Sequence, residues 1–245
     1  MSRFIQAILF DLGETLVYSK DPWEPILVQA DRALADKLFE LGITVDRESF
    51  HGEFNKSLKA YYADRDKDLY ERTTSMVLKN LLKDKGLNAV PDTVIRAALD
   101  ALYGVTQQNW HPEADAQPTL QKLQERGFRL GILSNAGDHK DVLDLVEKAQ
   151  IESYFDFVIT SALCSYRKPH PRIFQMALAH WGIIKPDEVA MVGDKLEADI
   201  WGAQRMGMLT FWMKRRYKQT REFSVQADFN INELSEIPSI LKRIK

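Results

Sequence analysis

The sequence of 245 residues predicts an α/β protein with a mainly parallel sheet and an all-helical domain inserted into it. From about residue 111 onward, short apolar runs alternate with helical patterns, which is typical of βαβ units and a parallel sheet. Between residues 20 and 109 the apolar side chains keep helical spacing without interruption. We therefore expect an α/β core formed by residues 1–19 and 110–245, and a helical cap domain at 20–109 whose ends lie close together.

The first strand is expected at residues 5–10, which are apolar nearly throughout, as in a strand covered on both faces. It ends at Asp11, and a tight turn over residues 12–19 is expected to follow. In the inserted segment, Asp46 is a favourable helix N-cap and Gly42 a favourable helix stop. This segment is expected to contain four helices, at about 22–41, 46–62, 69–85 and 93–103.

The remaining chain is expected to alternate between strands and helices, with proline near helix starts and glycine at helix ends. The strands are expected at 128–133, 157–160, 189–192 and 208–212, with a weaker one near 229–231. The helices are expected at 116–126, 139–149, 171–181, 199–206 and 235–243.

The composition limits the expected partners and compartment. A net charge of −2 gives no general attraction to nucleic acids or anionic membranes. No stretch is long and apolar enough for a signal peptide or a membrane-spanning helix, so we expect a cytoplasmic protein without nucleic-acid or membrane partners. Cys164 is the only cysteine, which excludes an internal disulfide and a thiolate metal cluster. The sequence gives no indication of oligomeric state.

Four polar side chains lie at or beyond the ends of four different predicted strands: Asp11, Ser134, Lys168 and Asp194. A parallel sheet gathers the carboxyl ends of its strands at one edge, so these residues are expected to converge. Two carboxylates suit Mg²⁺, whereas a lysine and a hydroxyl beside backbone N–H groups suit an anion. A cation site, an anion site and a carboxylate between them describe phosphoryl transfer by nucleophilic attack.

Four segments resemble motifs of the haloacid dehalogenase superfamily of hydrolases. They are residues 10–16 (FDLGETL), 132–135 (ILSN), 166–171 (YRKPHP) and 192–199 (VGDKLEAD), and they occur in the order and at the spacing of that family. The resemblance implies a three-layer, Rossmann-like core with the first strand at its centre. It also implies that the helical domain is a cap inserted after that strand.

The resemblance also implies roles for individual residues. Asp11 resembles the nucleophile that becomes an aspartyl-phosphate. Ser134 resembles the hydroxyl that holds the phosphoryl oxygens together with the backbone N–H of Asn135. Lys168 resembles the lysine that neutralises the nucleophile and the phosphate. These residues are thus the expected catalytic and substrate-binding groups.

The metal site implied by the resemblance takes Mg²⁺ between Asp11, Asp194 and the backbone carbonyl of Gly13. Asp199 resembles the second acid of its motif, which is either an indirect metal ligand or the partner of Lys168. A structural role is also open for Asp199, because aspartate caps the start of a helix well.

At Gly13 the sequence departs from the family pattern. Phosphatases of this family usually carry a second aspartate at this position, which protonates the leaving oxygen and then takes a proton from water. General acid–base catalysis of this kind is typically worth about 10²- to 10⁴-fold. Glycine cannot supply it, so the departure affects which function is expected. Glu14, one position further on, is a candidate replacement.

The leading hypothesis is a Mg²⁺-dependent phosphatase that acts on a small phosphorylated metabolite through Asp11 and does without this acid. Aryl or acyl phosphates would tolerate its absence best, because their leaving groups are good. A 2-haloacid dehalogenase-like hydrolase is an alternative, since halide needs no proton, but those relatives lack the Gly-Asp metal motif found here at 193–194. A low-turnover phospho-ligand-binding protein is another. A phosphonate-cleaving relative would use a cap lysine, and nothing distinguishes one among Lys20, Lys37, Lys56 and Lys59.

Other residues have weaker claims on function. The basic run 214–218 is interpreted as a solvated loop rather than a surface that steers anions. Cys164 is interpreted as an inert thiol and His139 as a residue that opens a helix. Tyr18 and Trp23 are interpreted as packing at the junction between cap and core.

Overall fold

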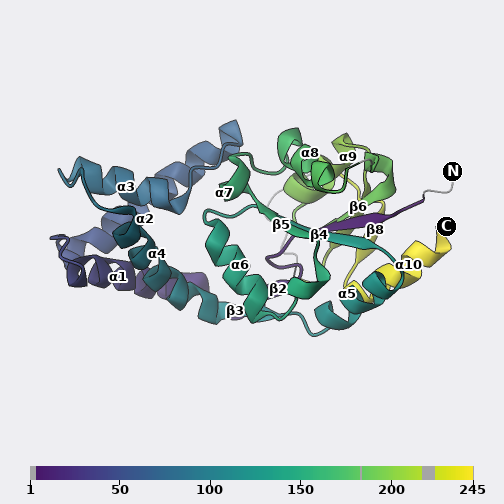
Figure 1. The fold of residues 1–245 in the computed structure, drawn as a ribbon, viewed down its shortest axis with the longest axis horizontal. Coiled ribbons are helices and arrows are strands. Elements are labelled where there is room, and N and C mark those ends of the chain that lie inside the picture. The colour runs from purple at the N-terminus through teal and green to yellow at the C-terminus, as the bar shows by residue number, and fades with distance from the viewer. Residues whose placement is uncertain (1–3, 183, 217–223, 245) are drawn as a thin grey trace.

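The computed structural model describes residues 4–182, 184–216 and 224–244, and in these residues six strands form one parallel sheet (Figure 1). The strand order is β5-β4-β1-β6-β7-β8, so the first strand lies inside the sheet, as expected. Phe10 pairs with Ile132 on one side and with Val192 on the other. The strands are β1 Ala7–Phe10, β4 Arg129–Ser134, β5 Phe157–Thr160, β6 Val189–Gly193, β7 Leu209–Met213 and β8 Phe229–Ile231.

Helices cover both faces of this sheet, which gives the predicted three-layer, Rossmann-like core (Figure 1). Side chains alternate along β1, so Ile8 and Phe10 pack into one apolar cluster while Ala7 and Leu9 pack into another. All four are buried, and a buried side chain of the size of Ile8, Leu9 or Phe10 contributes about 1.5–3 kcal/mol. The first cluster includes α5 Ala116–Glu125, α6 His139–Lys148 and α10 Ile237–Arg243; the second includes α8 Pro171–His180 and α9 Gly202–Arg205.

Over residues 20–109 the described chain forms a group of helices, called the cap from here on for its expected role, which lies beyond the sheet at the left of Figure 1. Its helices are α1 Trp23–Glu40, α2 Arg47–Asp68, α3 Thr74–Asp84 and α4 Asp92–Thr106. Asp46 caps α2 as predicted, since its side chain accepts from the backbone N–H of Glu48. The cap has its own apolar cluster, drawn from residues 30–102 and centred on Phe50 and Phe54. The cap therefore buries its apolar faces against one another rather than against the sheet.

A short strand pair joins the cap to the core, and the sequence did not predict it. β2 Val17–Ser19 runs antiparallel to β3 Trp110–Pro112, where a plain turn over residues 12–19 was expected. Strands of three residues are too short to show an alternating pattern, which explains the error. Rings also pack here: Tyr18 lies 5.8 Å from His111, and Trp23 lies 5.2 Å from Trp110, measured between centroids.

Several element boundaries differ from the prediction. α2 continues to Asp68 and α3 begins only at Thr74, so the segment 69–73 is a break between helices. Leu69 ends α2 in a left-handed conformation, with φ of 56°. A short helix, α7 Ser161–Cys164, lies in the predicted loop before Lys168. The other short helices are η1 Gln107–Asn109, η2 Glu152–Tyr154, η3 Pro186–Glu188, the π-helix η4 Leu196–Trp201 and η5 Leu234–Glu236.

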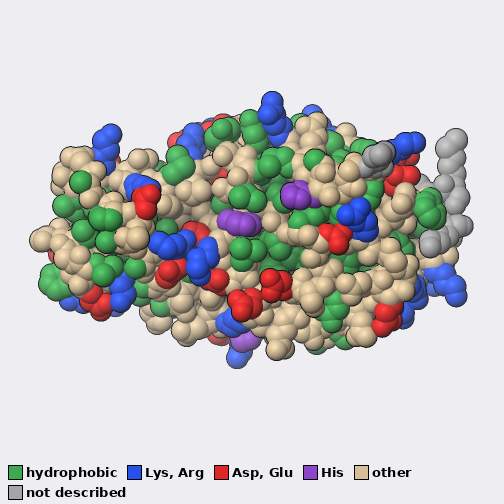
Figure 2. Space-filling model, viewed as in Figure 1, with side chains coloured by type: hydrophobic (Ala, Val, Ile, Leu, Met, Phe, Trp, Pro, Cys, Tyr) green, Lys and Arg blue, Asp and Glu red, His purple; other side chains and the backbone are tan. Residues whose placement is uncertain are grey.

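The surface carries mixed charge on the face shown in Figure 2, where basic and acidic side chains are interspersed. Among the described helices, none is both long and apolar enough to cross a bilayer.

Candidate active site

Lys168 is the centre of the site at the carboxyl edge of the sheet. Its Nζ lies 2.7 Å from Oδ1 of Asp11 and 2.6 Å from Oδ1 of Asp199, and it donates to the carbonyl of Leu133 at 2.6 Å. Asp11 follows β1 directly, and its N–H donates to the carbonyl of Val192 at 2.9 Å. The Lys168 and Asp199 side chains are almost fully buried. Residues distant in sequence therefore meet as expected from parallel strand ends.

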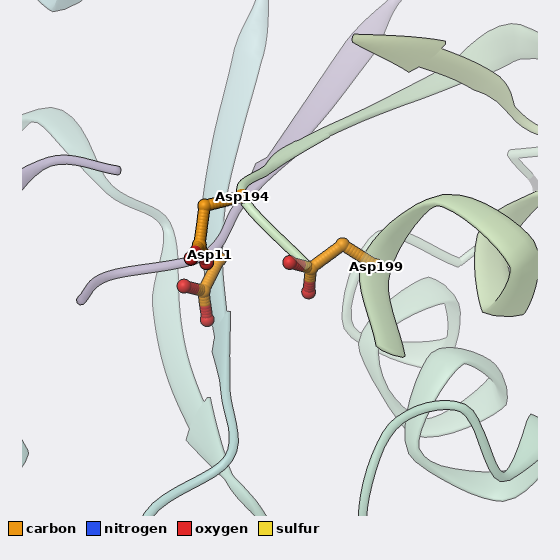
Figure 3. Close-up of side chains that lie close together, drawn as sticks. All are labelled: Asp11, Asp194 and Asp199. Atoms are coloured by element: carbon orange, nitrogen blue, oxygen red, sulfur yellow. The ribbon is translucent and has the colours of Figure 1, made fainter. Parts of the chain in front are cut away.

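The carboxylates of Asp11, Asp194 and Asp199 form one acidic cluster, with an oxygen of each within 4.8 Å of the others. Figure 3 shows Asp11 and Asp194 side by side at the strand ends, with Asp199 reaching toward them from a helix. Nζ of Lys195 contacts Asp194 at 2.8 Å, but 69% of the Lys195 side chain is exposed. Lys168 is thus the buried cation in contact with this cluster, and an excess of negative charge remains.

The charges of the cluster shift the pKa values of its members. Burial raises the pKa of Asp11 to about 6; Lys168 opposes this rise and Asp199 adds to it. Burial raises the pKa of Asp194 to about 7, with further increases from Asp11 and Asp199. Burial alone would lower the pKa of Lys168, but Asp11 and Asp199 outweigh it and the pKa is raised. A buried, oxygen-only donor set with excess negative charge fits a hard divalent cation such as Mg²⁺.

Asp199 uses its two oxygens differently. Oδ1 faces Lys168, while Oδ2 accepts from the backbone N–H of Lys195 at 2.9 Å within the turn that starts η4. The close approach requires glycine at 193, because a Cβ there would lie 2.3 Å from Oδ2 of Asp199. Of the roles considered for Asp199, the structure therefore shows contact with Lys168 together with a local backbone contact.

Ser134 is the last residue of β4, and Asn135 follows it directly. The Ser134 side chain is buried, two residues beyond the Phe10–Ile132 pair. The Asn135 side chain accepts from the backbone N–H of Lys168 at 2.8 Å and donates to its carbonyl at 2.9 Å. This amide clamp joins the Ser134 loop to the Lys168 loop. The sequence suggested only a role for the Asn135 backbone.

The space beside Gly13 is bounded by Trp110. A Cβ at residue 13 would lie 3.2 Å from Cη2 of that indole, closer than an ordinary van der Waals contact. Glu14 does not point into this space, because its Oε1 accepts from the Ser19 hydroxyl at 2.6 Å and from the Ser19 N–H at 3.1 Å. The structure therefore places the Glu14 carboxylate at the start of the cap connection rather than in the acid–base position.

In the described part of the basic run, residues 214–216, Lys214 is exposed as expected for a solvated loop, but Arg215 and Arg216 pair with acidic side chains. Arg215 and Arg216 both contact the buried carboxylate of Glu113, just after β3. Arg215 also contacts Asp115 at 2.6 Å, and the guanidinium of Arg216 lies 4.1 Å from the Tyr18 ring. These arginines tie the loop after β7 to the cap connection. Tyr217 and Lys218 lie outside the described residues.

The other weak candidates have structural surroundings. Cys164 is a free, buried cysteine, and burial raises the pKa of its thiol, so the neutral form is favoured. His139 is the first residue of α6, and its Nδ1 lies 3.0 Å from Oγ1 of Thr160. Tyr18 and Trp23 pack at the cap–core junction, as interpreted.

Glu71 and Arg167 form a buried ion pair beside the site, and little in the sequence indicates it. Arg167 could have been suspected because it precedes Lys168. Glu71 lies in the break between α2 and α3, a region predicted as the first turn of a helix at 69–85. Thr73, the N-cap of α3, was the available sign of this break.

Comparisons with known proteins agree with this geometry. A family model described as haloacid dehalogenase-like hydrolase matches residues 5–207. The chain is 29% identical over 244 residues to a glyceraldehyde 3-phosphate phosphatase of Pyrococcus furiosus, covering 98% of this chain and 95% of that protein. It is 28% identical over 242 residues to a ribulose-1,5-bisphosphate 5-phosphatase of Halopiger xanaduensis, covering 96% of this chain and 98% of that protein.

Solved structures show the same architecture over the whole chain. A HAD phosphatase from Thermococcus onnurineus aligns with a TM-score of 0.66 and 27% identity, covering 97% of this chain and 98% of that one. A 2-haloacid dehalogenase from Pseudomonas syringae pv. Tomato DC3000 aligns with a TM-score of 0.72 and 24% identity, covering 99% and 100%. At the latter identity the likeness concerns the fold alone.

Proposed function

The chain belongs to the haloacid dehalogenase-like hydrolases, and from this premise we propose that it is a Mg²⁺-dependent phosphatase of a small phosphorylated metabolite. The observation that carries the proposal is the position of Lys168, with Nζ 2.7 Å from Asp11 and 2.6 Å from Asp199. A carboxylate held by a buried ammonium at the end of a central strand is suited to attack a phosphoryl group, because the same ammonium can stabilise the incoming negative charge.

In the proposed reaction an Oδ of Asp11 attacks the phosphorus of a monoester. The bond from phosphorus to the ester oxygen breaks, an aspartyl-phosphate forms, and the leaving oxygen takes a proton from water to depart as the alcohol, because Gly13 offers none. Water then attacks this phosphorus, phosphate departs, and the Asp11 carboxylate is regenerated. Lys168 offsets the charge of the phosphoryl oxygens, while the Ser134 hydroxyl and the Asn135 N–H donate to them.

We propose that Asp11, Asp194 and the carbonyl of Gly13 hold the Mg²⁺, with Asp199 orienting Lys168. When bound, the ion would supply positive charge for the phosphoryl oxygens. The support is the acidic cluster, whose carboxylate oxygens lie within 4.8 Å of one another and outnumber the cations around them. The Lys168 contact then keeps Asp11 in the ionised form that attack requires.

The relatives named above indicate the class of substrate. One is named for glyceraldehyde 3-phosphate and another for ribulose 1,5-bisphosphate, and both match this chain over nearly its whole length. A small phosphorylated sugar is therefore the first class of compound to assay. Gly13 supplies no proton to the leaving oxygen, so acyl or aryl phosphates are expected to turn over faster than alkyl phosphates.

We also propose that residues 20–109 act as a cap over this site and that they begin and end at the β2–β3 strand pair. The support is the separate apolar cluster of these residues and the position of the strand pair where the chain leaves the core and returns to it. Closure would exclude water and bring cap side chains to the substrate.

The test is phosphate release from glyceraldehyde 3-phosphate, acetyl phosphate and p-nitrophenyl phosphate, with and without Mg²⁺. Replacing Asp11→Asn removes the nucleophile and is expected to lower turnover by at least about 10⁴-fold. Asp144→Asn, an exposed aspartate paired with Lys140, serves as the matched control and should leave turnover unchanged.

Phosphate release that survives Asp11→Asn would overturn the mechanism. Halide release from 2-chloropropionate, measured in parallel, would instead support a dehalogenase. Thermal stabilisation by a phosphorylated compound without any product would support a binding protein.

A further inference from the structure

The break between α2 and α3 lies against the loop that carries Lys168, on the side of the core where α7 is found (Figure 1). The N–H of Glu71 donates to the carbonyl of Ser165, and the N–H of Arg167 donates to the carbonyl of Leu69, both at 2.9 Å. Tyr70 and Tyr166 form an antiparallel bridge between these two bonds. The cap thus pairs its backbone with residues that directly precede Lys168.

The Glu71 carboxylate enters this contact from the cap and has no exposed surface. The Tyr61 hydroxyl, also from the cap, donates to Oε1. Two core groups donate to Oε2: the Arg167 guanidinium, and the Ser161 hydroxyl at 2.5 Å. Hydrogen bonds to a buried charge are stronger than those between neutral groups, so this carboxylate is the strongest polar link across the contact.

Ser161 extends the link to the loop that follows Ser134. Its Oγ lies 2.5 Å from Glu71 Oε2 and 3.2 Å from the carbonyl of Ala136, and it accepts from the Ala136 N–H at 2.9 Å. A hydroxyl has one proton, so the shorter contact identifies Glu71 as the acceptor. The hydrogen bonds therefore run from Ala136 through Ser161 to the cap carboxylate. The Thr74 N–H adds a bond to the Gly137 carbonyl at 2.9 Å.

Arg167 extends the link to Lys168 itself, its neighbour in sequence. The Asn135 amide then joins the two loops to each other, because it bonds both the N–H and the carbonyl of Lys168. Each of the two loops that face Asp11 is thus anchored to Glu71 by one side chain.

We propose that Glu71 is a positioning residue that holds the Ser134–Gly137 loop and the Arg167–Lys168 loop in their active arrangement only while the cap is docked. The proposal rests on the phosphatase function proposed above, for which these loops supply the anion site. Glu71 comes from the cap, so undocking removes the carboxylate from Ser161 and Arg167 at the same moment. Cap closure and assembly of the anion site then become one event.

The experiment compares Glu71→Gln with Arg96→Gln by amide hydrogen exchange and by steady-state kinetics. Arg96 makes a different cap–core ion pair, 2.6 Å from Asp138. It belongs to the group of basic and acidic side chains that Figure 2 shows over α4 and α6. Both substitutions remove a cap–core charge pair, but only Glu71→Gln removes the link to the two loops.

In Glu71→Gln, exchange of the Ala136 and Lys168 amides is expected to become at least about tenfold faster, and in Arg96→Gln to stay within about threefold of wild type. The kcat of Glu71→Gln should fall about 10²-fold while KM changes by less than about threefold, since misplaced catalytic groups affect the chemical step. Equal effects of the two variants would overturn the proposal, because Glu71 would then only retain the cap. Unchanged exchange at Ala136 and Lys168 would also overturn it.

Ser161→Ala provides a second test if Glu71→Gln does not fold. It cuts only the branch to Ala136, so faster exchange is expected at Ala136 and not at Lys168; equal protection of Ala136 would contradict the link. A wild-type protein that releases no phosphate would overturn the proposed function, whereas the exchange measurements would still decide the role of Glu71.

Discussion

Two of the contacts between cap and core, at the β2–β3 connection and at the break between α2 and α3, are built from different interactions. At the β2–β3 connection the contact is covalent, with ladder hydrogen bonds and packed rings, and the ring centroids of Trp23 and Trp110 are 5.2 Å apart. The charged groups there pair with other core residues, since Glu113 forms ion pairs with Arg215 and Arg216. At the break between α2 and α3 the contact is made of backbone hydrogen bonds, one ring contact between Tyr70 and Tyr166 (5.4 Å between centroids) and one buried carboxylate, Glu71.

The difference shows which contact is reversible. The groups at Glu71 are polar, so water can replace every partner when the cap moves away. The β2–β3 connection cannot separate without breaking strand pairing and exposing rings. A cap that opens and closes is therefore expected to keep the β2–β3 contact and exchange the Glu71 contact.

The largest stability effect is expected from Glu113→Gln at the β2–β3 connection. Only 6% of Glu113 is exposed, and removing its charge leaves two guanidinium groups facing a neutral amide. The free energy of unfolding, measured by urea denaturation, should fall by about 3 kcal/mol. Glu71→Gln should lower it by less, because its partners become hydrated when the cap undocks.

Lys37→Gln is the control for this comparison, since Lys37 and Glu40 form an exposed pair on α1. It should change the free energy of unfolding by no more than about 0.5 kcal/mol. If Glu113→Gln cost no more than this control, the two cap contacts would not differ in the way described.

A second prediction uses the position of Trp110, which belongs to the connection and also borders Gly13. Gly13→Asp restores the missing acid, but its Cβ would lie 3.2 Å from the indole. The double variant Gly13→Asp/Trp110→Phe relieves this contact, and its kcat on alkyl phosphates should rise by about 10- to 10²-fold. The gain on aryl phosphates should be smaller, because their leaving groups need less help from a proton.

The single variants separate the two effects. Gly13→Asp alone should gain less than the double variant, and Trp110→Phe alone should gain nothing. Equal gains on alkyl and aryl phosphates would mean that residue 13 is not an acid–base position.

The smallest effect is expected from Asp141 on α6, which accepts from the Gln107 side chain at 2.8 Å near the cap connection. Burial raises the pKa of Asp141 to about 7 from the ordinary 3.8, against the Gln107 hydrogen bond, which lowers it. The folded state therefore binds this proton more tightly than the unfolded state, and stability falls as the pH rises from about 4 to about 7. Asp141→Asn should raise the free energy of unfolding by about 1 kcal/mol at pH 8 and by almost nothing at pH 4.

Urea denaturation at pH 4 and pH 8 measures this difference. The exposed Asp64, paired with Lys67 on α2 and absent from the surroundings of Asp141, provides the control Asp64→Asn, which should show no such pH-dependent gain. A gain of the same size at both pH values for Asp141→Asn would show that the ionised carboxylate is not the cause.

The fold and the convergence of the four polar residues could be predicted because each depends on local pattern. Asp11 and Asp194 follow apolar runs of recognisable length, and a parallel sheet then fixes where their side chains meet. The contact of Lys168 with Asp199 followed from the family resemblance, which offered it as one of two roles.

The Glu71 contact could not be predicted, because its partners Ser161 and Arg167 lie 90 and 96 residues further along the chain. No local pattern marks a residue for so distant a pairing. The break that carries Glu71 contains neither glycine nor proline, so residues 69–73 were predicted as the start of a helix and the break was expected earlier, after residue 62. The Trp110 wall beside Gly13 was missed for a similar reason, since it depends on a strand pair of only three residues per strand.

The position of the β2–β3 strand pair determines how far each part of the cap would move if the cap rotated about it. The chain crosses to the cap at Ser19, eight residues after the nucleophile, and returns at Trp110 directly across the pair. A rotation of the cap about this strand pair would move Trp110 little and Glu71 farther, since Glu71 contacts Ser161 at the start of α7, across the molecule from β2 and β3 (Figure 1). In such a rotation the site would open on the side of Glu71, while Trp110 beside Gly13 would stay in place. We expect a substrate to enter past the two loops that contact Glu71, with its leaving group facing Trp110.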